Sequence, residues 1–443
     1  INAISNQTDT IIRLRQFGNN SYEMIYSVCG DENGNIYLAG SFNGSYLSFL
    51  DTVLSNSGTG YQSYIAKITS TGNFLWALTT SGTSENNVLH IAVSPNGNIS
   101  ATGTYFGQIN LGGMTLNNSF TGASNKNIFV ALIDNAGQVQ WLKQIEGRKE
   151  ENNCKIDINN SMIVVTGEFK SDTLSFNGNT MLNHDTITYN SQDIFVVAYD
   201  YFGTVLWYKN IGSRTTETKP DVIFNIVGDI FLSGTTGAWA SNPCYVDTFE
   251  IVTYSFLVKI SPIGNVIFVK SWPMYGGASS ICSDDNYVYF SDEFTSNFTI
   301  FGFNLNYAGG RDIYSAVYDF NGNCISVKSV GGFGYDYNNS IIAFNNKYYI
   351  GAQFQKNIII EGQYVTSMYS QNGVAGTPLV LNYTNLGSLN SFKDIKMQNY
   401  GSPSFVLKTK ENGTYKCYVI FGTEGEMLVN NKPYGNGWYL MKY

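Results

Sequence analysis

The sequence is poor in charged residues, and this shortage excludes several kinds of protein. Only 13% of the 443 residues are charged, whereas 43% are hydrophobic. Globular proteins usually carry about twice that share of charge, and a chain this apolar can bury a large core, so intrinsic disorder is excluded. The longest apolar runs, such as IFVVAY at 194–199, are far shorter than the roughly 20 residues of a membrane helix. We therefore expect a folded protein that does not insert into a membrane.

Basic residues are too few to favour nucleic acid as a partner. The formal net charge is −8, whereas nucleic acids and anionic membrane surfaces are bound by clustered Lys and Arg. The six cysteines form no CxxC pair, so neither a zinc site nor a disulfide framework is indicated. They are Cys29, Cys154, Cys244, Cys282, Cys324 and Cys417. Buried thiols are the favoured interpretation, disulfide pairing stays open, and no metal or cofactor is predicted.

Histidine is scarce, which leaves the common catalytic mechanisms without their residues. Only His90 and His184 are present, and catalytic triads and His-based metal sites need an imidazole. No HExxH, GxSxG or Walker-type motif occurs, so metalloprotease, serine hydrolase and nucleotide-binding sites are not indicated. We expect His90 to be partly buried with its hydrogen bonds satisfied, and His184 to be exposed beside Asp185.

Aromatic residues and glycine are abundant, and they mark an internal repeat. Two apolar strands flank a turn in SYIAKITSTGNFLW (63–76), IFVALIDNAGQVQW (128–141), IFVVAYDYFGTVLW (194–207), SFLVKISPIGNVIF (255–268) and YSAVYDFNGNCISV (314–327). The turns hold Gly72, Gly137, Gly203, Gly264 and Gly322, where a short hairpin with a bulge needs a positive φ. Trp76, Trp141, Trp207 and Phe268 then share one position. We expect the three tryptophans to pack between neighbouring repeats.

A second recurring strand gives the architecture. Copies such as NIYLAGSF (35–42), MIVVTGEF (162–169) and YVIFGTE (418–424) follow one another at about 60–70 residues, and seven copies fill the chain. With an innermost strand before each copy, every unit has four strands, named A to D here, which is the composition of a propeller blade. The predicted fold is all-β: a single seven-bladed β-propeller of four-stranded antiparallel blades.

The two ends of the chain complement each other. The last unit stops at Tyr443 after strand C, whereas TIIRLRQFG (10–18) matches the D strands of the other units. Pairing of 10–18 with 436–443 would complete the last blade and remove its free edge. We expect one domain, 1–443, with blades at about 19–82, 83–147, 148–212, 213–276, 277–332, 333–400 and 401–443 plus 10–18.

Most B–C connections carry a further apolar motif, such as INLGGMTL (109–116), which predicts a small extra hairpin. The repeat resembles the SBBP-type bacterial β-propeller repeat over essentially the whole chain. The resemblance lies in the G-x-F strand, this insert, the C–D hairpin and its closing Gly. The resemblance is best at 128–147 and 193–212 and weakest at 382–397. It implies an exported bacterial propeller, and it transfers no catalytic residue because the repeat motif is structural.

Polar clusters recur at the D-to-A junctions, where a propeller opens a funnel at one face. The candidate ligand-binding residues are Glu85, Arg148, Lys149, Glu151, Arg214, Glu217, Tyr335, Asp336 and Tyr337. On the functional interpretation, charged side chains line the funnel and the tyrosines stack on a ligand. On the alternative, acid and Asn side chains satisfy backbone groups in recurrent turns. The alternative is favoured because the clusters repeat in several blades.

Two functions compete on these observations. The favoured one is a non-enzymatic binding or scaffold protein outside the cytoplasm (extracellular, cell-surface or periplasmic), with a protein or glycan partner on a propeller face. The rival is a carbohydrate-active enzyme, a hydrolase or lyase, because glycosidases use two acids about 5–10 Å apart. Its carboxylates would include Glu85, Glu151, Glu217 and Asp336. Two of them converging in a pocket with raised pKa values would favour the enzyme.

Overall fold

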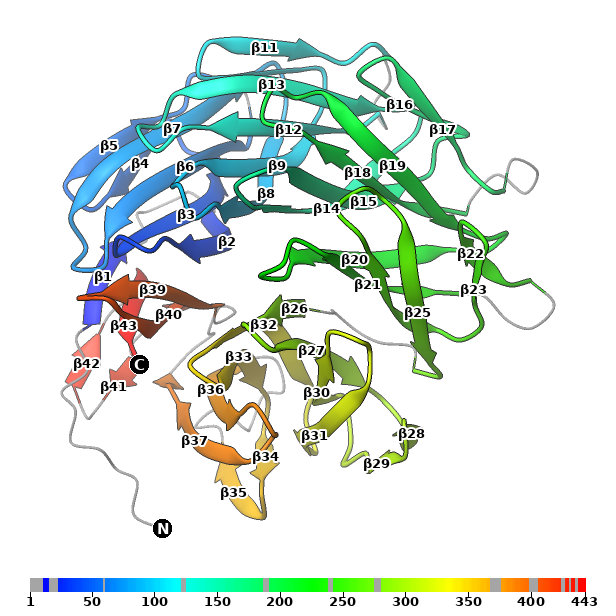
Figure 1. The fold of residues 1–443 in the computed structure, drawn as a ribbon. Helices are drawn as coiled ribbons and strands as arrows, with labels where there is room; N and C mark the ends of the chain where they lie inside the picture. Colours follow the sequence, from blue (N-terminus) through cyan, green and yellow to red (C-terminus); the bar gives the residue numbers. More distant parts are fainter. Residues whose placement is uncertain are drawn as a thin grey trace. The chain divides into compact units, whose positions relative to one another are not determined.

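The fold is built from β-strands, as Figure 1 shows. The computed structural model describes residues 11–15, 23–58, 60–120, 125–185, 191–237, 242–274, 280–366, 376–397, 405–423, 427–429, 432–434 and 437–443. Every regular element in these ranges is a strand, and none of the ranges contains a helix that could span a membrane. Strand pairing organises the chain into seven propeller blades, which confirms the predicted fold class.

Four blades lie in one compact unit, Asn19–Tyr275. Within each blade, strands A to D follow one another in antiparallel order. They are β2 (Glu23–Gly30), β3 (Asn35–Phe42), β6 (Gln62–Thr69) and β7 (Phe74–Gly82); β8 (Asn86–Val93), β9 (Ile99–Tyr105), β12 (Asn127–Ile133) and β13 (Val139–Glu146); β14 (Glu151–Ile158), β15 (Ile163–Phe169), β18 (Asp193–Tyr199) and β19 (Val205–Gly212); and β20 (Glu217–Phe224), β21 (Ile230–Thr236), β24 (Ser255–Ile260) and β25 (Val266–Trp272).

The second compact unit, Ile1–Gly18 with Gly276–Tyr443, holds three blades. Their strands are β26 (Ser280–Ser283), β27 (Tyr287–Phe294), β30 (Asp312–Asp319) and β31 (Cys324–Gly332); β32 (Asp336–Phe344), β33 (Lys347–Phe354), β36 (Thr377–Thr384) and β37 (Leu389–Asp394); and β39 (Phe405–Glu411), β40 (Thr414–Thr423), β43 (Gly437–Lys442) and β1 (Ile11–Arg15).

The N-terminal strand completes the last blade, as predicted. Strand β1 pairs antiparallel with β43, with Ile11 opposite Met441 and Arg15 opposite Trp438. The predicted strand was longer, but Thr10 and residues 16–18 lie outside the described residues. The blade boundaries and the single domain stay predictions.

An extra hairpin stands in the B–C connection of every blade. The hairpins are β4 (Tyr46–Phe49) and β5 (Thr52–Ser55), β10 (Gln108–Leu111) and β11 (Met114–Asn117), β16 (Thr173–Phe176) and β17 (Asn179–Leu182), β22 (Cys244–Val246) and β23 (Phe249–Ile251), β28 (Phe298–Ile300) and β29 (Phe303–Leu305), β34 (Asn357–Ile360) and β35 (Gln363–Thr366), and β41 (Met427–Val429) and β42 (Lys432–Tyr434). Four of them, at β10, β16, β22 and β34, pair with strand D of the preceding blade. Each of these four hairpins therefore links two consecutive blades.

Burial follows the position of a strand in its blade. All seven residues of β9 and of β15 are buried, because strands B and C are covered on both faces and so need continuous apolar sequence. Strand β19 alternates between half-buried and exposed side chains over its first half. The C–D turns keep one register, and Gly72, Gly137 and Gly203 have φ of 86°, 86° and 77°. The predicted turn conformation is confirmed.

Tryptophan at the start of strand D packs against the next blade. The indole Nε1 of Trp76 donates to the Asn135 carbonyl at 3.1 Å, and that of Trp141 donates to the Tyr201 carbonyl at 3.0 Å. Both acceptors lie in the C–D turn of the following blade. Trp207 repeats the contact with the Pro262 carbonyl at 2.9 Å. The predicted packing between blades is confirmed for all three tryptophans.

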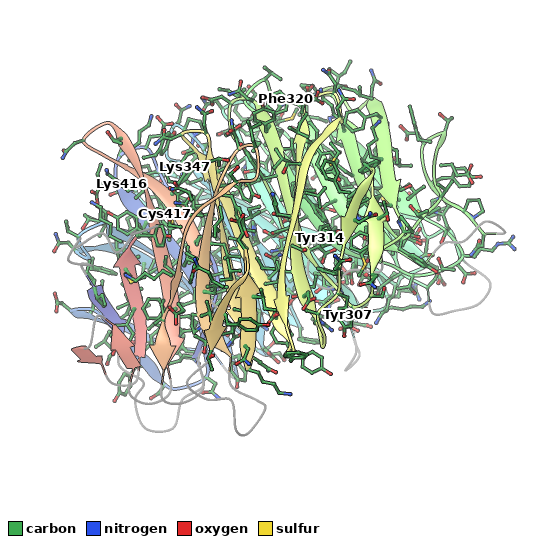
Figure 2. The ribbon with its side chains drawn as sticks, turned by 90° about the horizontal axis from the view of Figure 1, so that it is seen from below. Tyr307, Tyr314, Phe320, Lys347, Lys416 and Cys417 are labelled. Carbon is green, nitrogen blue, oxygen red and sulfur yellow. The ribbon has the colours of Figure 1, made fainter. Side chains whose placement is uncertain are left out.

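The two ends of each blade differ in what they carry. The A–B and C–D turns lie at one end, the turn edge, and the B–C connections and D–A junctions lie at the other, the junction edge. In Figure 2, Phe320, in the C–D turn of the fifth blade, lies at one edge of the second unit, and Tyr307, in the B–C connection, lies at the opposite edge. The predicted site residues belong to junction edges.

Candidate functional site

Three of the candidate carboxylates share one position, the first residue of strand A. Glu151, Glu217 and Asp336 occupy it in β14, β20 and β32, and each is fully buried. The backbone N–H of each donates, at 2.8–2.9 Å, to a carbonyl just before strand C of the preceding blade. The position therefore ties consecutive blades together.

Glu151 is held within its own junction. Its Oε1 accepts a hydrogen bond from the backbone N–H of Ser171 at 3.3 Å. Burial raises the pKa of Glu151 to about 8, against the hydrogen bonds from Ser171. The adjacent Lys149 donates its backbone N–H to Ser171 Oγ and forms an ion pair with Asp172 at 2.7 Å. These contacts fix the junction loop to the B–C connection of the same blade.

Glu217 satisfies the polar groups of a turn. Its Oε1 accepts from Ser213 Oγ at 2.7 Å, Thr215 Oγ1 at 3.2 Å and Thr236 Oγ1 at 2.7 Å, and its Oε2 accepts from the Ser213 N–H at 3.0 Å. Burial raises the pKa of Glu217 to about 7 despite these bonds. At this junction the structure agrees with the turn-stabilising interpretation.

The remaining charged candidates are surface side chains. Glu85 is exposed and accepts from Asn87 Nδ2 at 3.1 Å. Arg148 is exposed, with its guanidinium carbon 5.2 Å from the centre of the Phe120 ring, and Arg214 is exposed. The candidates of this unit belong to three separate junctions. The contacts of Glu85 and Arg148 are with residues near their own junction.

The junction between the fifth and sixth blades brings aromatic candidates together. Tyr335 and Tyr337 point to the same side of the chain, and their rings are nearly parallel at 16° with centroids 6.5 Å apart. Tyr335 is 51% exposed, and the neighbouring Phe333 is 68% exposed. We call Phe333, Tyr335 and Tyr337 the aromatic cluster.

Arg311, which the sequence analysis did not select, stands beside this cluster. Its Nη1 forms an ion pair with Glu293 Oε2 at 2.7 Å, and its guanidinium carbon lies 5.6 Å from the centre of the Tyr337 ring. Glu293 is buried and accepts the Asn338 N–H at 2.9 Å. In the third blade the equivalent residues are Gln192 and Glu168. There the neutral Gln192 Nε2 donates to Glu168 Oε2 at 2.7 Å. Comparing the residue before strand C across the repeats would have found Arg311.

Two buried acids lie at the same junction. Asp312 accepts the Ala308 and Gly332 N–H groups at 2.6 and 3.2 Å, and burial raises its pKa to about 6. Burial, and then the charge of Asp312, raises the pKa of Asp336 to about 8. Burial and the neighbouring Asp312 thus make Asp336 a weaker acid than an exposed aspartate.

The two histidines differ in environment. His90 Nδ1 lies 3.1 Å from the Ile156 carbonyl oxygen, and burial lowers its pKa, which agrees with the expected partly buried side chain with a hydrogen-bond partner. His184 is exposed and lies 2.9 Å from Asp193 Oδ2, whose hydrogen bond raises the imidazole pKa. Within the described ranges no group of three or more His, Cys, Asp or Glu side chains is arranged to hold a metal ion.

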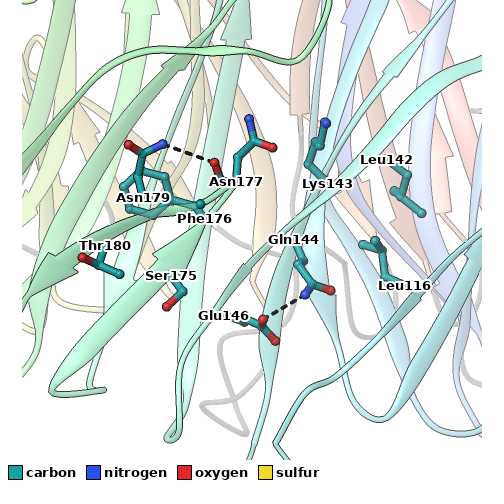
Figure 3. Close-up of a pocket in the computed structure, with 11 residues that line it drawn as sticks. Leu116, Leu142, Lys143, Gln144, Glu146, Ser175, Phe176, Asn177, Asn179 and Thr180 are labelled. Carbon is teal, nitrogen blue, oxygen red and sulfur yellow. Dashed lines mark hydrogen bonds between the residues drawn. The ribbon is translucent and has the colours of Figure 1, made fainter.

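A cavity of about 410 Å³ lies on the outer strand of the second blade. Figure 3 shows it between β13 and the hairpin β16–β17, with Leu116 of β11 at one side. Leu116, Leu142 and Phe176 provide its apolar lining, and Gln144 Nε2 donates to Glu146 Oε1 at 2.9 Å. None of these residues is predicted from the sequence, because the cavity arises from hairpin pairing between blades.

Comparison with known proteins gives no family for this chain. No model of a known protein family matches the chain, and no curated protein sequence matches it. Similar solved structures include a protein of unknown function from Bacteroides caccae, 8% identical with a TM-score of 0.33 over 75% of this chain and 89% of that one. Another, from Dyadobacter fermentans, is 11% identical with a TM-score of 0.37 over 78% and 94%.

A viral structure is similar at the same level. It is the subtype N11 neuraminidase-like protein of A/flat-faced bat/Peru (H18N11), 7% identical with a TM-score of 0.38 over 80% of this chain and 86% of that one. At these values the likenesses carry no argument about function. The chain is a seven-bladed β-propeller without a family assignment.

Proposed function

We propose that this chain is a non-enzymatic binding or scaffold protein that contacts a protein or glycan partner through the junction between its fifth and sixth blades. The observation that carries the proposal is the aromatic cluster of Phe333, Tyr335 and Tyr337 with Arg311 beside it. Exposed aromatic rings and Arg are enriched where proteins bind partners, because they combine large apolar area with polar groups.

The cluster breaks the repeat, which supports a role beyond folding. The corresponding positions of three other junctions are polar: Thr83, Glu85 and Asn87; Arg148, Glu150 and Asn152; Arg214, Thr216 and Thr218. Those junctions fold without aromatic side chains, so the fold itself does not require the rings. A solvent-exposed ring such as Phe333 gains little from folding while it stays in water.

Arg311 and Tyr337 are in contact with each other before any partner arrives. Arg311 is fixed by its ion pair with Glu293, and its guanidinium lies over the Tyr337 ring. A preorganised surface loses less conformational entropy on binding. Glu293 compensates the charge of Arg311. This favours a partner that contacts the aromatic rings and tyrosine hydroxyls of the cluster over a partner that binds Arg311 through an anionic group.

The buried carboxylates support the rival enzyme less well. Glu151, Glu217 and Asp336 do have raised pKa values, as catalytic acids often have. Each is fully buried, whereas a glycosidase needs two acids that reach the same glycosidic bond. Burial at a blade junction accounts for the raised values without catalysis.

We also propose that the protein acts outside the cytoplasm and is related to SBBP-type repeat propellers. The support is the low charge, the richness in Tyr and Asn, and the repeat pattern of the sequence. Expression with its native upstream sequence, followed by fractionation, tests the location.

The binding proposal is tested by comparing the full-length protein with a double variant, Phe333→Ala/Tyr335→Ala, on arrays of glycans and purified cell-surface proteins. We expect at least about tenfold weaker binding of whatever ligand the wild type selects. Tyr364→Ala is the matched control, since Tyr364 is 70% exposed on β35. Polysaccharide cleavage that is lost in a folded Asp336→Asn variant would support the enzyme instead.

A further inference from the structure

The turn edge of the third and fourth blades carries four strongly exposed apolar side chains. Phe202 lies in the C–D turn of the third blade, Ile226 and Val227 in the A–B turn of the fourth, and Ile263 in the C–D turn of the fourth. They are 87%, 66%, 68% and 76% exposed. We call these four residues the apolar tip. It is on the turn edge of these two blades, opposite to their own junction edge.

The three turns are neighbours, so the apolar tip is one surface. A carbon added to Gly228, next to Val227, would lie 3.7 Å from Pro262 Cγ, next to Ile263. It would also lie 3.9 Å from Asn159 Nδ2, and the Asn159 carbonyl accepts the hydroxyl of Tyr201, next to Phe202. The turns are thus connected through Asn159 and Pro262.

The turns do not need these side chains in order to form. The A–B turn of the first blade has the same geometry with Glu32 and Asn33 before Gly34, and the second has Pro95 and Asn96 before Gly97. What the turn requires is the Gly at positive φ. Apolar residues at these tips therefore do not serve the turn, and exposed apolar surface of this kind marks an interaction site.

We propose that the apolar tip is the interface through which two copies of this chain associate. At the exposed fractions above, the four side chains present roughly 500 Å² in one copy and about 1,000 Å² in two, which is the lower threshold for a biological interface. A two-fold pairing places the same patch on both sides, and an apolar patch is complementary to itself.

The charges around the tip favour this occupant over a membrane. Asp200 accepts the Phe202 and Thr204 N–H groups at 2.9 and 2.8 Å, and Asp229 is paired with Lys259 at 2.8 Å. The charge of Asp229 is compensated within one copy, and the Asp200 carboxylate is hydrogen-bonded within its own turn. Anionic lipid would instead be attracted by clustered Lys and Arg.

Sedimentation equilibrium of the full chain tests the proposal. The variant Ile226→Glu/Val227→Asn gives the fourth blade the Glu–Asn–Gly turn that the first blade already uses, so it is expected to fold. We expect a dimer for the wild type and at least a tenfold higher dissociation constant for the variant. Leu386→Asn is the control, because Leu386 is 60% exposed in the C–D turn of the sixth blade; it should leave the dimer unchanged.

Three results would overturn the proposal. The first is a wild type that is monomeric at about 100 μM, well above the dissociation constant of specific complexes. The second is a dimer that the double variant does not weaken. The third is binding to phosphatidylcholine vesicles that depends on Ile226 and Val227 while the chain stays monomeric. The last result would assign the tip to a lipid surface.

Discussion

Trp141 illustrates how a single side chain can stabilise two blades. Its ring is almost completely buried, and its Nε1 donates to a carbonyl in the C–D turn of the next blade. The ring packs 6.0 Å, centre to centre, from Tyr199 of that blade. Apolar area and one directed hydrogen bond therefore act together, which explains why a large aromatic residue with an N–H group recurs at this position.

Truncating Trp141 should be costly. Trp141→Ala removes a buried ring and leaves a cavity, so we expect a loss of roughly 3–5 kcal/mol in the free energy of unfolding. Trp76→Ala should cost less because Trp76 is only half-buried. Urea denaturation of both variants measures the difference. A Trp141→Ala protein that keeps its stability but loses a ligand would show that the residue belongs to a binding site.

Individual positions were predictable to different degrees. Tyr335 and Tyr337 could be selected because they interrupt a polar repeat, and the structure places their rings side by side. Arg311 stands out only when the residue before strand C is compared across the repeats, and its partner Glu293 lies on another strand. Glu151 and Glu217 were selected as exposed funnel residues, but charge alone does not reveal that the first residue of strand A is buried.

At the scale of elements, the C–D hairpin combines local and non-local constraints. Gly137 has a φ of 86°, and a carbon added to it would lie 2.9 Å from the Trp76 ring of the preceding blade. Gly178, in the turn of the β16–β17 hairpin, has a φ of 80° but nothing within 4 Å. The two positions share a backbone conformation and differ only in what surrounds them.

This pair allows the two constraints to be measured separately. Gly178→Ala should cost roughly 1–2 kcal/mol through backbone strain alone. Gly137→Ala should cost more, because the added methyl group also displaces Trp76. Thermal unfolding of both variants gives the difference. Equal losses would mean that the contact between Gly137 and Trp76 contributes nothing to stability.

The elements themselves could be read from the sequence, whereas their partners could not. Alternating apolar residues and a turn Gly are local signals, and they located the strands and the B–C hairpins. Nothing local states that β16 pairs with β13 of the preceding blade. The cavity in Figure 3 depends on that pairing, so it was beyond the reach of the sequence.

At the scale of the whole molecule, buried carboxylates in both units should make stability depend on pH. Glu151, Glu217 and Asp336 have pKa values raised to about 8, 7 and 8. Between their unfolded pKa values near 4 and these values, the folded chain holds protons that the unfolded chain releases. These three groups release protons on unfolding, so their contribution to stability falls as pH rises.

We therefore expect the melting temperature to decrease from about pH 5 to pH 8. Each group contributes at most about 1.4 kcal/mol per pH unit in this window. The Glu151→Gln variant should show a flatter profile, because its amide cannot ionise. Lys126 and Lys170 lower the pKa of Glu150. Glu150 therefore makes stability rise with pH, but only at pH values more acidic than this window. A melting temperature that rises between pH 5 and 8 would contradict the buried-acid account.

The N-terminal strand closes the last blade from the far end of the sequence. Strand β1 covers the edge of β43, and Leu14 is fully buried. Deleting residues 1–18 would leave that edge unpaired and remove buried apolar area, so we expect the melting temperature to fall by roughly 5–10 °C. The exposed edge should also promote association between chains. Differential scanning calorimetry and light scattering measure the two effects.

A shorter deletion and a peptide decide whether strand pairing is the cause. Deleting residues 1–9 keeps β1 and should leave the melting temperature unchanged. Adding a synthetic peptide of residues 10–18 to the 1–18 deletion should restore part of the lost stability, because a strand can be supplied to an open sheet edge by a separate chain. If the longer deletion melts like the intact protein, β1 does not hold the last blade together. If the peptide has no effect, the loss comes from covalent continuity and not from pairing with β43.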